Sequence, residues 1–89
     1  MRIDSNFKVR NIADEHLLIM QSGQHTNMTK VISLNATALE LFNAFSDADF
    51  ELQQVEEFLI NQYGIDLDLA QKDALAWVTK LSEAGVIQN

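Results

Sequence analysis

Hydrophobic residues follow two periods along the chain, and the period changes at Asn35. Apolar and β-branched residues form short β-type patterns at residues 7–12, 16–22 and 29–34, which predict three strands. After Asn35 the apolar side chains recur at spacings of three and four, which is typical of one helical face. The stretch KVISLNATALELFNAF at residues 30–45 is therefore a strand that joins a helix almost without a loop, with Asn35 as the helix N-cap.

Polar segments separate the three predicted strands. Ala13, Asp14 and Glu15 have the right length for a hairpin connection, and residues 23–28 supply a polar turn that contains a glycine and an asparagine. The strands are therefore expected to pair as an antiparallel meander.

The rest of the chain is predicted to form three helices, at residues 35–45, 52–63 and 68–84. Gly64 is the natural stop of the second helix, and Asp68 with a glutamine three residues later fits a capping box at the start of the third. Three strands followed by three helices predict an α+β fold, in which the helices pack on one face of a small antiparallel sheet.

Composition sets the size and class of the domain. A chain of 89 residues, 47% of them hydrophobic, can form one modest core and not two, so we expect residues 1–89 to form a single domain. Because cysteine is absent, disulfides, thiolate-bound metals and thiol nucleophiles are excluded. No apolar run is long enough for a transmembrane helix, and the N-terminus lacks the apolar segment of a signal peptide. We therefore expect a cytoplasmic protein without a membrane partner.

Charge and residue types argue against nucleic acid, metal and catalysis. The net charge is −7, and the six Lys and Arg residues are too dispersed to form the basic stripe that nucleic acid requires. His16 and His25 lack the spacing of zinc ligands. The chain has no Gly-rich phosphate loop, nucleophile elbow or HExxH helix. We therefore expect no catalytic residue, no bound metal and no cofactor.

Three local patterns, in this order, resemble the PqqD family, coenzyme PQQ synthesis protein D. They are SLNATALELF at residues 33–42, VEEFLINQYGID at 55–66 and ALAWVTKLSEAGVI at 74–87. The resemblance covers nearly the whole chain and implies a winged-helix-like module without catalytic activity. Such a module captures the leader segment of a ribosomally made precursor peptide by β-strand addition and presents it to a modifying enzyme, often a radical SAM protein. The resemblance is to the family and not to its PQQ branch.

The resemblance implies that the peptide adds beside the third strand and lies against the third helix. The residues expected to contact it are Lys30, Val31, Ile32, Ser33, Asp73, Trp77, Lys80 and Leu81. The alternative for the strand residues is an ordinary strand, although an open edge without prolines needs a reason. Trp77 could instead be a core residue. Asp73 and Lys80 could instead lie on a solvent-exposed helix face, where charges contribute little.

Two other classes of protein remain as alternatives. A winged-helix DNA-binding transcription regulator would insert its third helix into the major groove, but that helix balances Lys72 and Lys80 against Asp73 and Glu83. A structural protein would instead form a homodimer through the open edge of its third strand.

Overall fold

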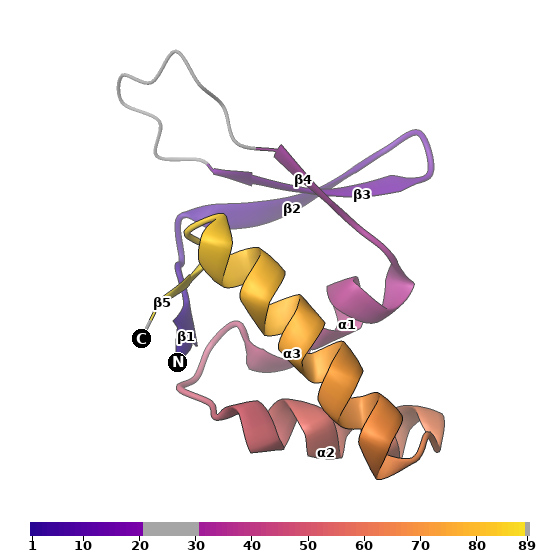
Figure 1. The fold of residues 1–89 in the computed structure, drawn as a ribbon. Coiled ribbons are helices and arrows are strands. Elements are labelled where there is room, and N and C mark those ends of the chain that lie inside the picture. Colours follow the sequence, from indigo (N-terminus) through magenta and orange to yellow (C-terminus); the bar gives the residue numbers. More distant parts are fainter. Residues whose placement is uncertain (21–30, 89) are drawn as a thin grey trace.

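The computed structural model describes residues 1–20 and 31–88 (Figure 1). Its elements are, in order, β1 (Arg2–Ile3), β2 (Phe7–Ile12), β3 (Glu15–Met20), β4 (Val31–Leu34), α1 (Ala36–Phe45), α2 (Leu52–Tyr63), α3 (Leu67–Glu83) and β5 (Ile87–Gln88). Three main strands precede three helices, so the predicted α+β fold is confirmed. The predicted turn at residues 23–28, the adjoining ends of two predicted strands, His25 and Lys30 lie outside the described residues.

The three main strands form an antiparallel sheet in the order β2-β3-β4. Its register extends from Phe7↔Met20 to Ile12↔Glu15 between β2 and β3, and from His16↔Leu34 to Ile19↔Val31 between β3 and β4. This is the predicted meander, and it makes β4 an edge strand. In Figure 1 the sheet lies above the helices, and β4 descends from it directly into α1.

The hairpin between β2 and β3 turns through two residues, so the predicted three-residue connection is wrong. Ala13 and Asp14 both have left-handed backbones, with φ of 48° and 69°, as a type I′ turn requires. This turn matches the right-handed twist of the flanking strands, and Glu15 therefore belongs to β3. Alanine rarely adopts a left-handed backbone, which explains why the sequence did not reveal this turn.

A second, two-stranded sheet joins the two ends of the chain. β1 pairs antiparallel with β5, with Arg2 opposite Gln88 and Ile3 opposite Ile87. The Asp4 amide also donates to the Val86 carbonyl at 2.8 Å. Figure 1 shows the N- and C-termini side by side below the main sheet. Two-residue strands are too short for alternation to be visible, so the sequence pattern did not predict this pairing.

The first two helices begin and end as their sequences predict. The Asn35 side chain accepts a hydrogen bond from the Ala38 amide at 2.8 Å, which confirms Asn35 as the N-cap of α1. At the start of α2, Glu51 and Gln54 form a reciprocal capping box. Gly64 ends α2 in a left-handed conformation, with φ of 66°, which glycine adopts without steric cost.

The N-cap of the third helix lies two residues earlier than predicted. This N-cap is Asp66, whose side chain accepts from the Leu69 amide at 2.8 Å, and the predicted cap Asp68 lies inside the first turn. Either carboxylate has the chemistry of a cap, and the extended backbone of Asp66 decides between them. None of the helices that the structure describes is long and apolar enough to cross a membrane.

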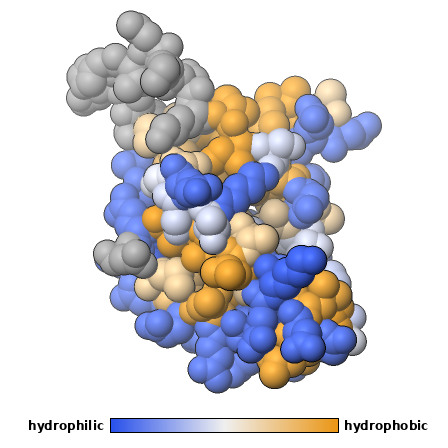
Figure 2. All heavy atoms as spheres, viewed as in Figure 1, coloured by the Kyte–Doolittle hydropathy of each residue, from blue (hydrophilic) through white to orange (hydrophobic). Residues whose placement is uncertain are grey.

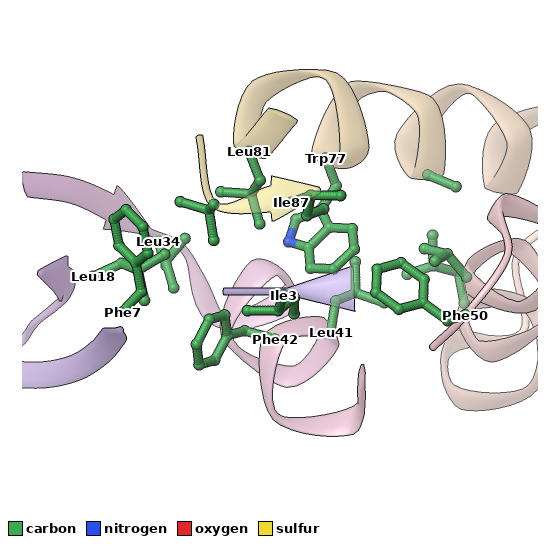
Figure 3. Packing of buried hydrophobic residues seen from close by; sticks show 14 of the residues in the cluster. Ile3, Phe7, Leu18, Leu34, Leu41, Phe42, Phe50, Trp77, Leu81 and Ile87 are labelled. Atoms are coloured by element: carbon green, nitrogen blue, oxygen red, sulfur yellow. The ribbon is translucent and has the colours of Figure 1, made fainter. Parts of the chain in front are cut away.

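One hydrophobic core joins the inner face of the main sheet to the helices and to the β1–β5 pair. Its buried members are Ile3, Phe7, Leu18, Leu34, Leu41, Phe42, Phe50, Val55, Leu59, Ala70, Ala74, Trp77, Leu81, Val86 and Ile87. Figure 3 shows Trp77 and Leu81 pointing from α3 into this cluster. The Phe50 ring bridges two others, with centroids 5.0 Å from Phe45 and 6.1 Å from Trp77. The core therefore fixes the position of α3 relative to β4.

Candidate functional site

β4 is one of the two edge strands of the main sheet, and β2 is the other. β3 pairs with one side of β4, and no strand among the described residues pairs with its other side. Val31 is 52% exposed and Ser33 is exposed, whereas Ile32 is half-buried and Leu34 is buried. Figure 2 shows hydrophobic atoms gathered over the sheet, on the side of the β2–β3 turn.

The β2–β3 turn determines which backbone groups point toward β4. A two-residue turn of this type is closed by a pair of residues that exchange hydrogen bonds, here Ile12 and Glu15. Backbone groups of successive residues in a strand face opposite sides. The groups of Glu15 therefore face β2, and those of His16 and Leu18 face β4.

The same alternation sorts the residues of β4 into two sets. The β3 residues that face β4 lie opposite Leu34 and Ile32, so these two exchange hydrogen bonds with β3. The amides and carbonyls of Val31 and Ser33 consequently point away from the sheet. An independent contact agrees, because the Lys80 ammonium on α3 donates to the Ser33 carbonyl at 3.2 Å. The outward-facing groups of β4 thus lie within reach of α3.

A groove of about 300 Å³ lies beside the end of β4. Its lining residues are Asn35, Thr37, Ala38, Leu41, Leu59, Asp73, Ala76, Trp77 and Lys80. The start of α1 and one face of α3 form its sides, and Leu59 of α2 contributes to it between them. Asp73 and Lys80 carry opposite charges on the same helix face. The groove therefore offers an apolar interior with a polar and charged rim.

The residues predicted to form the site occupy three different environments. Val31 and Ser33 present backbone groups at the open edge, and Asp73 and Lys80 are exposed at the groove. Ile32 is half-buried, and its backbone faces β3. Lys30 lies outside the described residues.

The two apolar residues predicted on α3 differ in their access to the groove. Trp77 lines the groove, although only 6% of its surface is exposed. Its indole Nε1 is buried without a hydrogen-bond partner among the described residues. Leu81 is 0% exposed, so it supports α3 from below and has no surface in the groove. Trp77 therefore belongs to the core and also lines the groove.

Sequence reasoning missed the part of the groove that comes from α1 and α2. Thr37 and Ala38 follow the N-cap directly, and Leu59 belongs to the apolar stripe of α2. The single signal in the sequence was the short joint at Asn35, which places the first turn of α1 next to β4. Leu59 has no such signal, because its contribution depends on how α2 packs against α3.

A polar contact ties α1 to the end of α2 next to the groove. The Tyr63 hydroxyl donates a hydrogen bond to the Glu40 carboxylate, and Glu40 lies one helical turn after Thr37. This hydrogen bond is the main cause that raises the pKa of Tyr63 above its usual value of 10.0. No group of three or more His, Asp or Glu side chains in residues 1–20 and 31–88 is arranged to hold a metal ion.

Comparisons with known proteins found one family and two similar solved structures. The family model for "Coenzyme PQQ synthesis protein D (PqqD)" matches residues 15–87. The structure "TbiB1 in Complex with the TbiA(beta) Leader Peptide" has a TM-score of 0.75 and 13% identity, over 100% of this chain and 96% of that chain. "Lasso peptide synthetase B1 complexed with the leader peptide" has a TM-score of 0.71 and 23% identity, over 99% of this chain and 96% of that chain. At these identities the likeness is one of fold. No curated protein matched the sequence.

Proposed function

This chain belongs to the PqqD family, and on that basis we propose that it is a non-catalytic module that binds the leader segment of a ribosomally made precursor peptide. Both similar solved structures are complexes with leader peptides, which supports this choice of ligand. In the proposal the leader adds as a strand to the open edge of β4 and lies against α3. The observation that carries the proposal is the outward direction of the Val31 and Ser33 backbone groups.

The edge of β4 has the chemistry for backbone recognition. The Val31 and Ser33 amides and carbonyls provide two donors and two acceptors, which suit a pair of alternate residues in an added strand. Such hydrogen bonds provide affinity that does not depend on sequence. The lack of proline in the chain leaves this edge without one of the usual devices that block strand addition.

The groove supplies the selectivity that the edge lacks. Side chains in an added strand alternate between the two faces of the sheet, so every second residue of the leader would point to the face that Ile32 and Leu34 share. There the groove offers apolar surface from Leu41 and Trp77. Its rim charges, Asp73 and Lys80, provide further discrimination between peptides.

Family membership also supports a second partner, an enzyme that modifies the bound precursor. We propose that this enzyme is of the radical SAM type and that both proteins act in the cytoplasm, where the precursor is made. In this arrangement the present chain holds the leader while the enzyme acts on the core segment. The chain itself contributes binding and no chemistry.

Selection of peptides followed by hydrogen exchange tests the proposed function. An mRNA-displayed library of random 20-residue linear peptides is selected against the immobilised chain, and the tightest peptide is synthesised. We expect the Val31 and Ser33 amides to exchange rapidly in the free protein and slowly in the complex. The Ile32 amide, already bonded to β3, is the internal control and should be slow in both. Recovery of binders that leave the exchange of Val31 and Ser33 unchanged would refute the edge as the docking site.

Self-association through the same edge is distinguished in the same preparation. Two copies paired at β4 would protect the Val31 and Ser33 amides without any peptide, and sedimentation would give the mass of a dimer. Added peptide would then compete with the second copy. A monomer whose amides become protected only with peptide supports the peptide-binding function.

A further inference from the structure

The open edge of β4 is partly covered by a lysine from α3. The Lys80 ammonium donates to the Ser33 carbonyl at 3.2 Å, which occupies one of the two outward acceptors of the strand. Lysine at a sheet edge opposes unwanted strand pairing because its charge must be displaced before another strand can bind. An added strand brings its own amide to the Ser33 carbonyl from the same open side of β4, so it competes with the Lys80 ammonium for this acceptor.

Lys80 forms no ion pair among the described residues, and the acidic residue nearest to it along α3 is Glu83, one helical turn later. The one ion pair in the part of the chain that the structure describes joins Arg2 and Asp49 and does not involve α3. Asp73 lines the same groove but lies seven residues, about two helical turns, before Lys80. A displaced ammonium would therefore lose its acceptor at the strand, and an anionic group of the incoming peptide would give it a new partner inside the groove.

We propose that Lys80 guards the Ser33 carbonyl in the free protein and, once displaced, pairs with a carboxylate of the bound peptide. This inference rests on the peptide-binding function proposed above and names the chemistry of the peptide. The guard discriminates between ligands, because a strand without a carboxylate must displace the ammonium and gives it no new partner. An acidic strand displaces it and binds it.

The geometry of the edge places the carboxylate in the peptide sequence. If the added strand is antiparallel to β4, the peptide residue whose amide replaces Lys80 lies opposite Ser33 and has its side chain on the outer face, as Ser33 does, and its two neighbours face the groove side. The acidic residue is therefore adjacent to that donor. Two positions further along, on the same face, a side chain reaches the apolar surface of Ala38 and Leu41. The expected signature is an acidic and an apolar residue separated by one position, in an order set by the strand direction.

A double-mutant cycle tests the pairing. The probe is the tightest peptide selected from the random 20-residue mRNA-displayed library, together with a version in which its groove-facing acidic residue is replaced by glutamine. Both are titrated against the parent chain and Lys80→Met, which keeps the length of the side chain and removes its charge. Lys72→Met, at an exposed position of α3 outside the groove, is the matched control.

The expected coupling between Lys80 and the acidic residue is roughly two- to fivefold in Kd, in the range of exposed ion pairs, and Lys72 should show none. Because the guard is gone, Lys80→Met should also bind the glutamine peptide more tightly than the parent does. As a second readout, selection against Lys80→Glu should replace the acidic residue by Lys or Arg and keep the apolar one.

The possible negative results distinguish the role of Lys80 from the peptide-binding function. Selected peptides that protect the Val31 and Ser33 amides but lack an acidic residue at the groove face would refute the role of Lys80 and leave the peptide-binding function standing. Absence of coupling at Lys80, or equal coupling at Lys72, would do the same. Peptides that bind without protecting the β4 edge would refute the proposed function itself.

Discussion

Proline substitutions at successive positions of β4 test the direction of its backbone groups. Proline removes one backbone N–H, and at position 32 the extended backbone of Val31 satisfies its restraint on the preceding residue. At position 32 the lost amide faces β3, whereas at position 31 it faces away from the sheet. The pair Ile32→Pro and Val31→Pro should therefore differ strongly in stability, with Ile32→Ala and Val31→Ala as controls that retain the amide.

The size of the difference follows from the contacts at each position. Ile32→Pro removes a ladder hydrogen bond, which contributes about 1 kcal/mol to stability. It also leaves the Leu18 carbonyl without a donor, and because Leu18 is 0% exposed, this costs about 1–3 kcal/mol more. We expect a loss of roughly 2–4 kcal/mol relative to Ile32→Ala, against a total of roughly 4–13 kcal/mol for a domain of this size. Val31→Pro should stay within about 0.5 kcal/mol of Val31→Ala, because the side chain is exposed and the amide makes no bond to β3.

Thermal and urea melts measure the stabilities. A loss of 2–4 kcal/mol lowers the Tm of a domain this small by roughly 8–30 °C. Calorimetric titration with the selected peptide then measures binding by the folded variants. Val31→Pro should weaken binding roughly two- to tenfold relative to Val31→Ala, the equivalent of one hydrogen bond. Equal destabilisation at both positions, or Val31→Pro that binds as tightly as Val31→Ala, would show that the assigned directions are wrong.

Three further predictions concern the groove and the helices around it. Trp77→Ala should cost about 3–5 kcal/mol in urea unfolding because the ring is buried in the core; a cost under 1 kcal/mol would place Trp77 outside it. Tyr63 is the sole tyrosine, so absorbance at 295 nm reports its titration directly, and its midpoint should lie above 10.0 and fall in Glu40→Ala. Because the pKa of Tyr63 is raised in the folded protein, the Tyr63–Glu40 contact stabilises the protein at pH values below the ordinary tyrosine pKa. This stabilisation is lost as the pH rises through the folded pKa. An unchanged midpoint in Glu40→Ala would contradict the contact. Asn35→Ala should lose about 1 kcal/mol of capping energy, whereas Asn43→Ala, at an exposed position of the same helix, should not lower the Tm, because alanine has a higher helix propensity than asparagine.

The elements with a dense local signal were predictable from sequence. The bounds of α2 follow from apolar residues at spacings of three and four and from Gly64, whose left-handed backbone is confirmed. Asn35 could be assigned as a cap because a β-type pattern ends at one side of it and a helical pattern begins at the other. In both cases the deciding interaction lies within a few residues, where the sequence pattern reports it directly.

The features that depend on distant residues could not be predicted. The β1–β5 pair joins the two ends of the chain through strands of two residues each. The choice of Asp66 over Asp68 as a cap depends on backbone conformation and not on residue type. For the site, the resemblance indicated β4 and α3, but the direction of the β4 backbone groups required the register and the two-residue turn. The contribution of Leu59 to the groove required the packing of α2.

The β1–β5 pair also determines how the molecule responds to tension. Arg2 lies opposite Gln88 and Ile3 opposite Ile87, so a force that separates the two termini acts on the same end of both strands. The pairs then open one after another, as in a zipper, and each step opposes the force with few hydrogen bonds. The β1–β5 pair should therefore open at a lower force than the main sheet, before β2, β3 or β4 separate. Tension applied at either terminus would therefore open the β1–β5 pair first, and the edge of β4 would keep its geometry.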